Sequence, residues 1–158
     1  MAAERLVKLL LERGYHVATA ESCTGGLLSA AMVDISGASE VFEEGSITYS
    51  DRVKKKLLGV SGESLEKYTA VSRQVAEEMA KGARRAAGTE VSVSVTGYAG
   101  PDAGEDGTPA GTVYIGCDVL GEISVKECHF SGDRNEVRRK AAEEAVSFAL
   151  ENIMTAQL

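Results

Sequence analysis

The sequence has few residues of the kinds that bind metals or form disulfides. Its 158 residues include three cysteines and two histidines, and no two cysteines stand in a C-x-x-C pair. An odd number of scattered cysteines does not build a disulfide framework, and no metal-ligand spacing is present. We therefore expect no metal and no other cofactor, and a chain that works in a reducing compartment.

Long apolar runs are also missing. No run approaches the length that crosses a membrane, and the first residues, MAAERLVKLLLERG, have the pattern of an amphipathic helix rather than a signal peptide. The net charge is −7, from 17 basic and 24 acidic residues, which disfavours general binding to nucleic acid or to a membrane surface. We expect a cytoplasmic protein with neither of these partners.

Helical and strand periodicities alternate along the chain, without internal repeats, linkers or low-complexity tracts. One domain over residues 1–158 is expected. The pattern predicts an α/β fold, a three-layer α/β/α sandwich around a mixed, mostly parallel sheet with a late antiparallel hairpin. Helices are expected over 2–13, 27–37, 51–59, 61–68, 72–88 and from 133 onward, and strands over 15–20, 45–50, 90–96, 112–119 and 122–130.

The stretch AESCTGG follows the first predicted strand, where ligands gather in open α/β sheets. Ser22, Cys23 and Thr24 are three consecutive candidate nucleophiles. Gly25 and Gly26 then open a helix, and we expect their free N–H groups to bind a phosphate or the oxyanion of an acyl-transfer intermediate. The stretch matches neither a dinucleotide-binding fingerprint nor a P-loop. A catalytic elbow, an anion cradle and a simple tight turn all remain open on these residues.

A nucleophile needs a base, and neither histidine is well placed to act as one. His16 lies in the first predicted strand, far from its carboxyl end, and His129 lies in the last one. A Ser-His-Asp triad is therefore not supported. A lysine is the alternative where burial or nearby cations lower its pKa.

The run DRVKKKLLG offers three lysines on one short predicted helix. Helical spacing places Lys54 on the apolar stripe of Val53, Leu57 and Leu58, while the other two lysines project elsewhere. Burial on this stripe and repulsion from the neighbouring cations would both lower the pKa of Lys54. The alternative is a lysine that extends past the edge of the core into solvent.

A second candidate anion site lies in SGDRNEVRR, at the start of the last predicted helix. Asp133 is expected to cap this helix, which places Arg134 in its first turn. A cation there opposes the helix dipole, and a bound phosphate would offset that cost. Arg138 is the competing choice, and a solvated arginine is the alternative without a ligand.

Several stretches together resemble the C-terminal domain of the CinA family, the nicotinamide-nucleotide amidases. They are AESCTGG, GSITYSDRVKKKLLGV, AVS, SVTGYAGPDAG, PAGTVYIG and FSGDRNEVR, and they cover almost the whole chain. The resemblance implies a three-layer domain with a mixed sheet. It also implies hydrolysis of the carboxamide of nicotinamide mononucleotide to nicotinate mononucleotide and ammonia, in pyridine nucleotide salvage, by a serine and a lysine without a metal.

Carried over by motif, the resemblance assigns the catalytic pair to Ser22 and Lys54. The substrate site that it implies contains Thr24, Gly25, Gly26, Ser39, Tyr49, Thr96, Gly97 and Arg134. Tyr98 departs from the aliphatic residue that the family commonly has in TGxAGP; an aromatic ring there either stacks on a pyridine or covers the pocket.

Two other functions stay open beside the serine amidase. One is a thiol amidase in which Cys23 attacks, assisted by Glu21 and Lys54. The other is a non-catalytic module of the same fold that binds a nucleotide or a partner. The expected ligand in either enzyme is a small nucleotide, and the expected assembly is a homo-oligomer.

Overall fold

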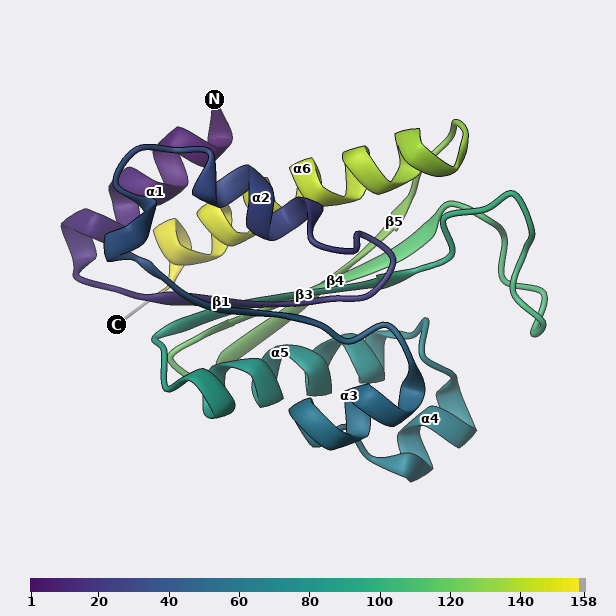
Figure 1. Ribbon diagram of the computed structural model, residues 1–158. Coiled ribbons are helices and arrows are strands. Elements are labelled where there is room, and N and C mark those ends of the chain that lie inside the picture. Colours follow the sequence, from purple (N-terminus) through teal and green to yellow (C-terminus); the bar gives the residue numbers. More distant parts are fainter. Residues whose placement is uncertain (157–158) are drawn as a thin grey trace.

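A computed structural model describes residues 1–156, and it contains one five-stranded sheet with helices on both faces (Figure 1). The strand order is β2-β1-β3-β4-β5. Strands β2, β1 and β3 are parallel, and β4 is antiparallel to both β3 and β5, so β5 runs in the direction of the first three. The predicted mixed, mostly parallel sheet with a late hairpin is confirmed. The strands are β1 Val17–Glu21, β2 Phe42–Ile47, β3 Val91–Gly97, β4 Thr112–Val119 and β5 Glu122–His129.

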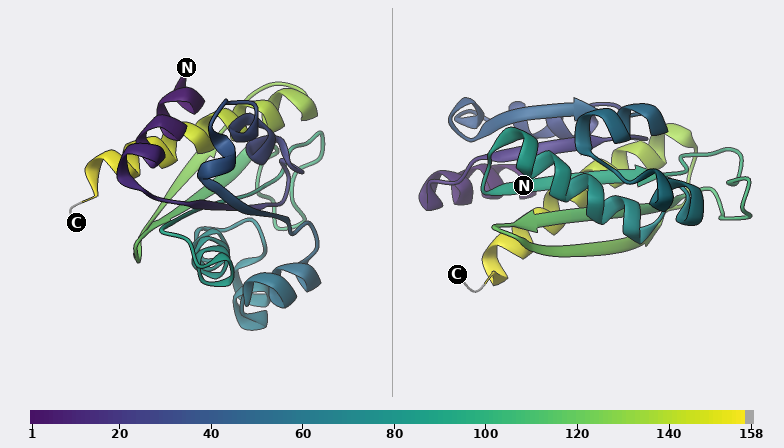
Figure 2. Two further views of the ribbon diagram at one scale, coloured as in Figure 1. Left: turned by 60° about the vertical axis from the view of Figure 1, so that its left-hand side comes forward. Right: turned by 90° about the horizontal axis from the view of Figure 1, so that it is seen from below.

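The helices form two outer layers, which confirms the α/β/α prediction. Helices α1, α2 and α6 cover one face of the sheet, and α3, α4 and α5 cover the other (Figures 1 and 2). Their bounds are α1 Ala2–Arg13, α2 Leu27–Val33, α3 Asp51–Leu58, α4 Gly62–Tyr68, α5 Arg73–Ala87 and α6 Arg134–Thr155. Within residues 1–156, none of these helices is both long and apolar enough to pass through a bilayer.

The central strand β3 is buried on both of its faces. Its valines, at 91, 93 and 95, are fully buried in the larger core under α1 and α6. Its alternate residues Ser92 and Ser94 are also fully buried, and their hydroxyls donate to the carbonyls of Ala80 and Ala76 in α5. The alternation in EVSVSVT therefore reflects two buried faces, one of which binds the backbone of a helix.

Two elements, α2 and β2, differ from the sequence prediction by more than two residues at an end. Helix α2 ends at Val33 rather than at residue 37, and a short 3₁₀ turn, η1 (Ala38–Glu40), leads into β2. Strand β2 spans Phe42–Ile47 rather than 45–50 because its register with β1 pairs Val17 with Phe42 and Glu21 with Ile47. The residues after β2 are then free to turn, and Ser50 caps α3.

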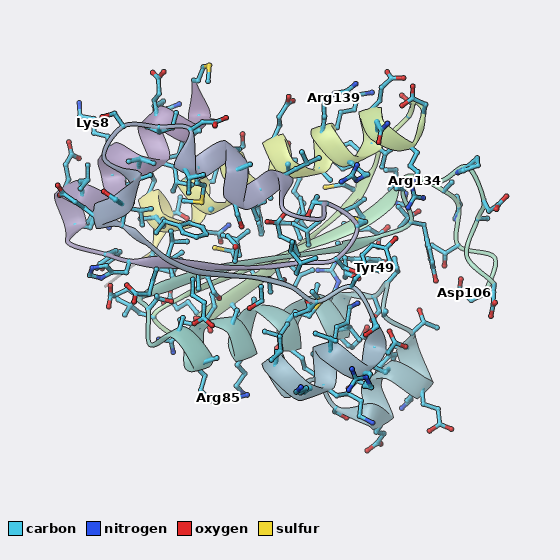
Figure 3. The ribbon with its side chains drawn as sticks, in the orientation of Figure 1. Lys8, Tyr49, Arg85, Asp106, Arg134 and Arg139 are labelled. Atoms are coloured by element: carbon cyan, nitrogen blue, oxygen red, sulfur yellow. The ribbon has the colours of Figure 1, made fainter. Side chains whose placement is uncertain are left out.

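The carboxyl ends of β1, β2 and β3 meet at one edge of the sheet, since the three strands are parallel. The segments that follow them, 22–26, 48–50 and 98–111, therefore gather at this edge. Figure 3 shows Tyr49 and Arg134 there, near the loop that carries Asp106, whereas Lys8 lies on α1 toward the other end of the sheet.

Candidate active site

The first turn after β1 is organised by a buried carboxylate. Glu21, the last residue of β1, has no exposed surface. Its Oε1 accepts hydrogen bonds from the N–H groups of Gly26 and Leu28, and its Oε2 accepts from the N–H and the hydroxyl of Ser29. The negative charge also lies at the positive end of the α2 dipole. Glu21 thus satisfies the N-terminus of α2 and fixes the path of the chain between strand and helix.

This arrangement corrects the expectation that the N–H groups of Gly25 and Gly26 are free. The Gly26 N–H donates to Glu21, and the Gly25 N–H donates to the carbonyl of Ser22. Both glycines have positive φ, 56° and 107°, which explains why residues without a Cβ stand there. The two glycines make the turn but offer no N–H to an anion. Within residues 1–156, neither the Cys23 N–H nor the Thr24 N–H donates a hydrogen bond to another residue, so both are open donors after Ser22.

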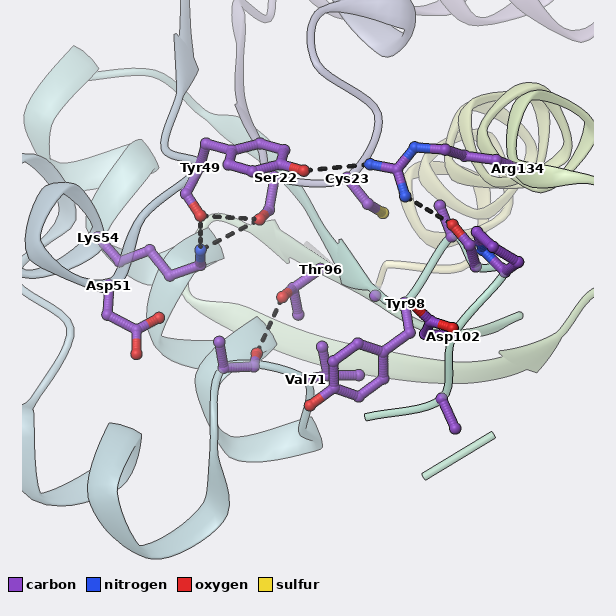
Figure 4. A pocket seen from close by; sticks show the side chains of 16 residues that line it. Ser22, Cys23, Tyr49, Asp51, Lys54, Val71, Thr96, Tyr98, Asp102 and Arg134 are labelled. Carbon is purple, nitrogen blue, oxygen red and sulfur yellow. Dashed lines mark hydrogen bonds between the residues drawn. The ribbon is translucent and has the colours of Figure 1, made fainter. Parts of the chain in front are cut away.

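Ser22 and Lys54 meet at the end of this turn. The Nζ atom of Lys54 donates to the Oγ of Ser22 at 3.1 Å and to the main-chain carbonyl of Tyr49 at 2.9 Å (Figure 4). Lys54 is 1% exposed and Ser22 is 8% exposed. The carbonyl fixes the amine against the hydroxyl, so the pair has the geometry of a nucleophile and its base.

The burial of Lys54 was expected, but its neighbours on α3 differ from the expectation. Leu58 is buried beside it, whereas Leu57 is 47% exposed and Val53 is half-buried. Burial lowers the pKa of Lys54 because the charged form loses its hydration. The predicted repulsion from neighbouring cations does not contribute. The largest influence of a charged neighbour comes instead from Asp51, whose carboxylate partly offsets the lowering of the pKa.

Ser22 and Lys54 lie in a cavity of about 410 Å³ at the edge where the parallel strands end (Figure 4). The predicted site residues that line it are Ser22, Tyr49, Lys54, Thr96, Gly97 and Arg134. Its other lining residues are Cys23, Asp51, Ala70, Val71, Tyr98, Ala99, Gly100, Pro101, Asp102 and Ala103. Segments distant in sequence thus converge on one hydroxyl.

The remaining predicted residues do not line the cavity. Thr24 is fully buried under the turn, and Gly25 and Gly26 are part of the turn itself. Ser39 lies on η1 before β2, in a separate hollow beside Val33, and thus at the amino end of β2. Since the cavity lies at the carboxyl ends of the strands, Ser39 lies apart from Ser22 and Lys54, and the structure does not bring it to their cavity.

The two candidate phosphate-binding arginines have different surroundings. Arg134, the first residue of α6, lines the cavity, and its guanidinium donates to the carbonyl of Gly100 at 2.6 Å and to the Tyr49 hydroxyl at 3.3 Å. Arg138 instead donates to the carbonyls of Cys23 and Thr24 and so holds the turn from below. Of these two arginines, Arg134 is the one that lines the cavity.

Cys23 lines the cavity next to Ser22, but its surroundings make it a poor nucleophile. Burial raises the pKa of its thiol to about 11, so the thiolate is scarce at neutral pH. The amine of Lys54 is hydrogen-bonded to the hydroxyl of Ser22 and not to this thiol.

Tyr98 forms a wall of the cavity and is supported from behind by the loop that follows it. A side chain at Gly104 would place its Cβ 2.5 Å from the Tyr98 ring, so the glycine allows the loop to lie against the aromatic face. The nearby Thr96 hydroxyl donates to the carbonyl of Ala70. The loop thus packs against the Tyr98 ring, which lines the cavity.

Asp51, Asp102 and the main-chain carbonyl of Tyr49 were not predicted from the sequence as parts of the site. Asp51 lies three residues before Lys54 in YSDRVK, and this helical spacing was the available signal. The carbonyl belongs to the backbone, so the type of residue at position 49 gives no sign of it. Within residues 1–156, no three or more His, Cys, Asp or Glu side chains are arranged to hold a metal ion.

The fold and the site define a three-layer α/β domain with a serine hydrogen-bonded to a buried lysine at the strand ends. Comparison with known proteins gives the family: the sequence pattern of the CinA C-terminal domain matches residues 1–153. The chain belongs to the CinA C-terminal domain family.

Two curated relatives are similar in sequence over nearly all of this chain. The chain is 46% identical over 151 residues to a putative competence-damage inducible protein of Clostridium botulinum, which covers 96% of the chain and 37% of that protein. It is 47% identical over 145 residues to a CinA-like protein of Kosmotoga olearia, which covers 92% of the chain and 35% of that protein. The chain therefore spans little more than a third of these relatives.

Solved structures agree on the fold. The competence damage-inducible protein A of Klebsiella pneumoniae superimposes with a TM-score of 0.96 at 37% identity, over 99% of this chain and 97% of that one. A CinA superfamily protein of Escherichia coli gives a TM-score of 0.93 at 41% identity, over 95% of this chain and 87% of that one.

Proposed function

We propose that the chain hydrolyses the carboxamide of nicotinamide mononucleotide, releasing ammonia and nicotinate mononucleotide, with Ser22 as nucleophile and Lys54 as base. The observation that carries the proposal is the 3.1 Å hydrogen bond between Lys54 Nζ and Ser22 Oγ inside a cavity. A buried amine with a lowered pKa beside a hydroxyl is the pairing that a metal-free acyl transfer needs.

In the acylation step, Ser22 Oγ attacks the carboxamide carbon while neutral Lys54 accepts the hydroxyl proton. The carbonyl oxygen takes up the negative charge, and the N–H groups of Cys23 and Thr24, which donate to no other residue in the described part of the chain, are the candidate donors for it. Lys54 then gives its proton to the departing nitrogen, so that the C–N bond breaks and ammonia leaves. An ester between Ser22 and the nicotinoyl group remains.

Deacylation repeats the same proton transfers with water. Lys54 accepts a proton from a water molecule that attacks the ester carbon, and it then returns the proton to Ser22 Oγ as the ester bond breaks. The product is a carboxylic acid, which ionises at neutral pH. The Tyr49 carbonyl, which accepts a hydrogen bond from Lys54 Nζ at 2.9 Å, keeps the amine oriented in both steps.

Arg134 is suited to the ribose phosphate. Its contacts with Gly100 and Tyr49 fix the guanidinium at the cavity wall and leave further N–H donors for a bidentate contact. Its position in the first turn of α6 adds the positive end of a helix dipole, which favours an anion. The aromatic ring of Tyr98 offers a face to the pyridine between these two ends.

The test is ammonia release by the purified protein supplied with nicotinamide mononucleotide, in the presence of excess chelator. The proposal requires ammonia and nicotinate mononucleotide in equal amounts, at a rate that chelation does not change. Nucleotide binding without ammonia would favour the non-catalytic module. A rate that recovers only when a metal is added would contradict the metal-free mechanism. A homo-oligomeric assembly stays a prediction.

A further inference from the structure

Asp51 is a charged group of the cavity that the mechanism above does not use. It is the first residue of α3, lies three residues before Lys54, and lines the cavity (Figure 4). Residues three apart on a helix are neighbours on its surface. Among residues 1–156, no ion-pair partner neutralises the Asp51 carboxylate.

The charged side chains of the cavity lie in two pairs at its opposite sides (Figure 4). Arg134 and Asp102 lie at one side, where Pro101 and the Gly100 carbonyl also lie. Lys54 and Asp51 lie at the other side, beside the nucleophile (Figure 4). A charge that appears on the ligand beside Ser22 is therefore on the same side of the cavity as Asp51 (Figure 4).

The proposed reaction creates such a charge. The substrate carries a neutral carboxamide on a pyridinium ring, and the product carries a carboxylate at the same carbon. The phosphate, the ribose and the ring cation are common to both nucleotides. Substrate and product thus differ by one negative charge, which forms at the end of the cavity that holds Asp51.

We propose that Asp51 makes the cavity discriminate against the carboxylate product, so that nicotinate mononucleotide leaves and does not compete with the substrate. The inference rests on the function proposed above. Its physical basis is like-charge repulsion across the cavity, while the attraction of Asp51 for the pyridinium acts on both nucleotides and cancels in their comparison. For a carboxylate that is open to solvent, we expect a three- to tenfold effect on the ratio of the two affinities.

The discrimination also has a role after chemistry. Deacylation leaves an acidic product next to Lys54, and a protonated Lys54 would hold the carboxylate by an ion pair. The charge of Asp51 opposes that attraction. The same charge raises the pKa of Lys54, which hinders its action as a base. Asp51 thus favours product release at the expense of proton transfer.

The experiment measures binding without turnover and without the titration of Lys54. In the Lys54→Met variant, the dissociation constants of nicotinamide mononucleotide and nicotinate mononucleotide are determined by calorimetry, and again after adding Asp51→Asn. We expect the second substitution to tighten product binding three- to tenfold relative to substrate binding. Asp51→Glu, which retains the charge, should keep the original ratio. High salt should reduce the difference.

Asp102→Asn is the matched control, since it removes the same charge from the Arg134 side of the cavity. It should change both affinities in common and leave their ratio within twofold. If Asp51→Asn also leaves the ratio within twofold, or shifts it toward the substrate, the inference is overturned while the amidase proposal stands. If neither the folded Lys54→Met variant nor the unmodified chain binds either nucleotide, both proposals fail.

Discussion

The amine of Lys54 lies 3.1 Å from the hydroxyl of Ser22, although 32 residues separate them in the sequence. The turn after β1 presents the serine, and the first turn of α3 presents the lysine. Their contact depends on the parallel pairing of β1 with β2, which brings both turns to one edge of the sheet. The predictions below test what this pair does and what keeps it in place.

The protonation state of Lys54 gives the first prediction. Lys54→Arg should be as inactive as Lys54→Ala, because a guanidinium does not release its proton in this pH range. Each should lose about three orders of magnitude or more in the rate of ammonia release. Lys55→Ala and Lys56→Ala, which remove exposed lysines of the same helix, should retain most activity. A working Lys54→Arg enzyme would mean that the residue supplies only positive charge.

The burial of Lys54 also has a cost in stability. The pKa of this group is lower in the folded chain than the 10.5 of an ordinary lysine, so its protonated form is destabilised by folding. Lys54→Met should therefore raise the free energy of unfolding at neutral pH, by about 1–2 kcal/mol. The advantage should be full below the lowered pKa and should disappear as the pH rises toward 10.5. Thermal unfolding as a function of pH measures it, and a destabilised variant at pH 7 would refute the argument.

Substitution of Arg134 should affect ligand binding, whereas substitution of Arg138 should affect stability. Arg134→Ala should weaken the binding of nicotinamide mononucleotide by about tenfold or more, and should have little effect on the phosphate-free riboside. Arg138→Ala should instead lower the melting temperature, because it frees the carbonyls of Cys23 and Thr24 that the guanidinium binds. Calorimetric titration with both ligands makes the comparison. Equal losses for nucleotide and riboside in Arg134→Ala would assign Arg134 to structure.

Glu21 should prove essential to the turn. Glu21→Ala leaves the buried N–H of Leu28 and the partly buried N–H groups of Gly26 and Ser29 without their acceptor, and should lower the free energy of unfolding by about 2–3 kcal/mol. Glu43→Ala, at an exposed position on β2, is the control and should change it by less than about 0.5 kcal/mol. Equal effects of the two substitutions in urea unfolding would mean that the cap contributes nothing.

The sequence predicted the layers of the fold because they follow from local patterns. Helical spacing identified Lys54 as the buried lysine of its run, and the Asp133 cap placed Arg134 in the first turn of α6, where the structure has it. The order of helices and strands was sufficient for the mixed sheet.

What the sequence did not reveal depends on contacts between distant segments. The N–H of Gly26 is satisfied by Glu21, a buried carboxylate that no periodicity marks as a helix cap. Lys54 also donates to a backbone carbonyl, that of Tyr49, and Ser39 lies before the amino end of β2, away from the cavity. Each of these follows from tertiary packing, which a motif does not encode.

The central claim is that Ser22, rather than the adjacent Cys23, attacks the amide. The most direct test compares ammonia release from nicotinamide mononucleotide by Ser22→Ala and by Cys23→Ala, with both variants shown to be folded and to bind the nucleotide. The account predicts a loss of about three orders of magnitude or more in Ser22→Ala and a rate within about tenfold of the unmodified chain in Cys23→Ala. Near-normal ammonia release by Ser22→Ala, together with a dead Cys23→Ala enzyme, would contradict it.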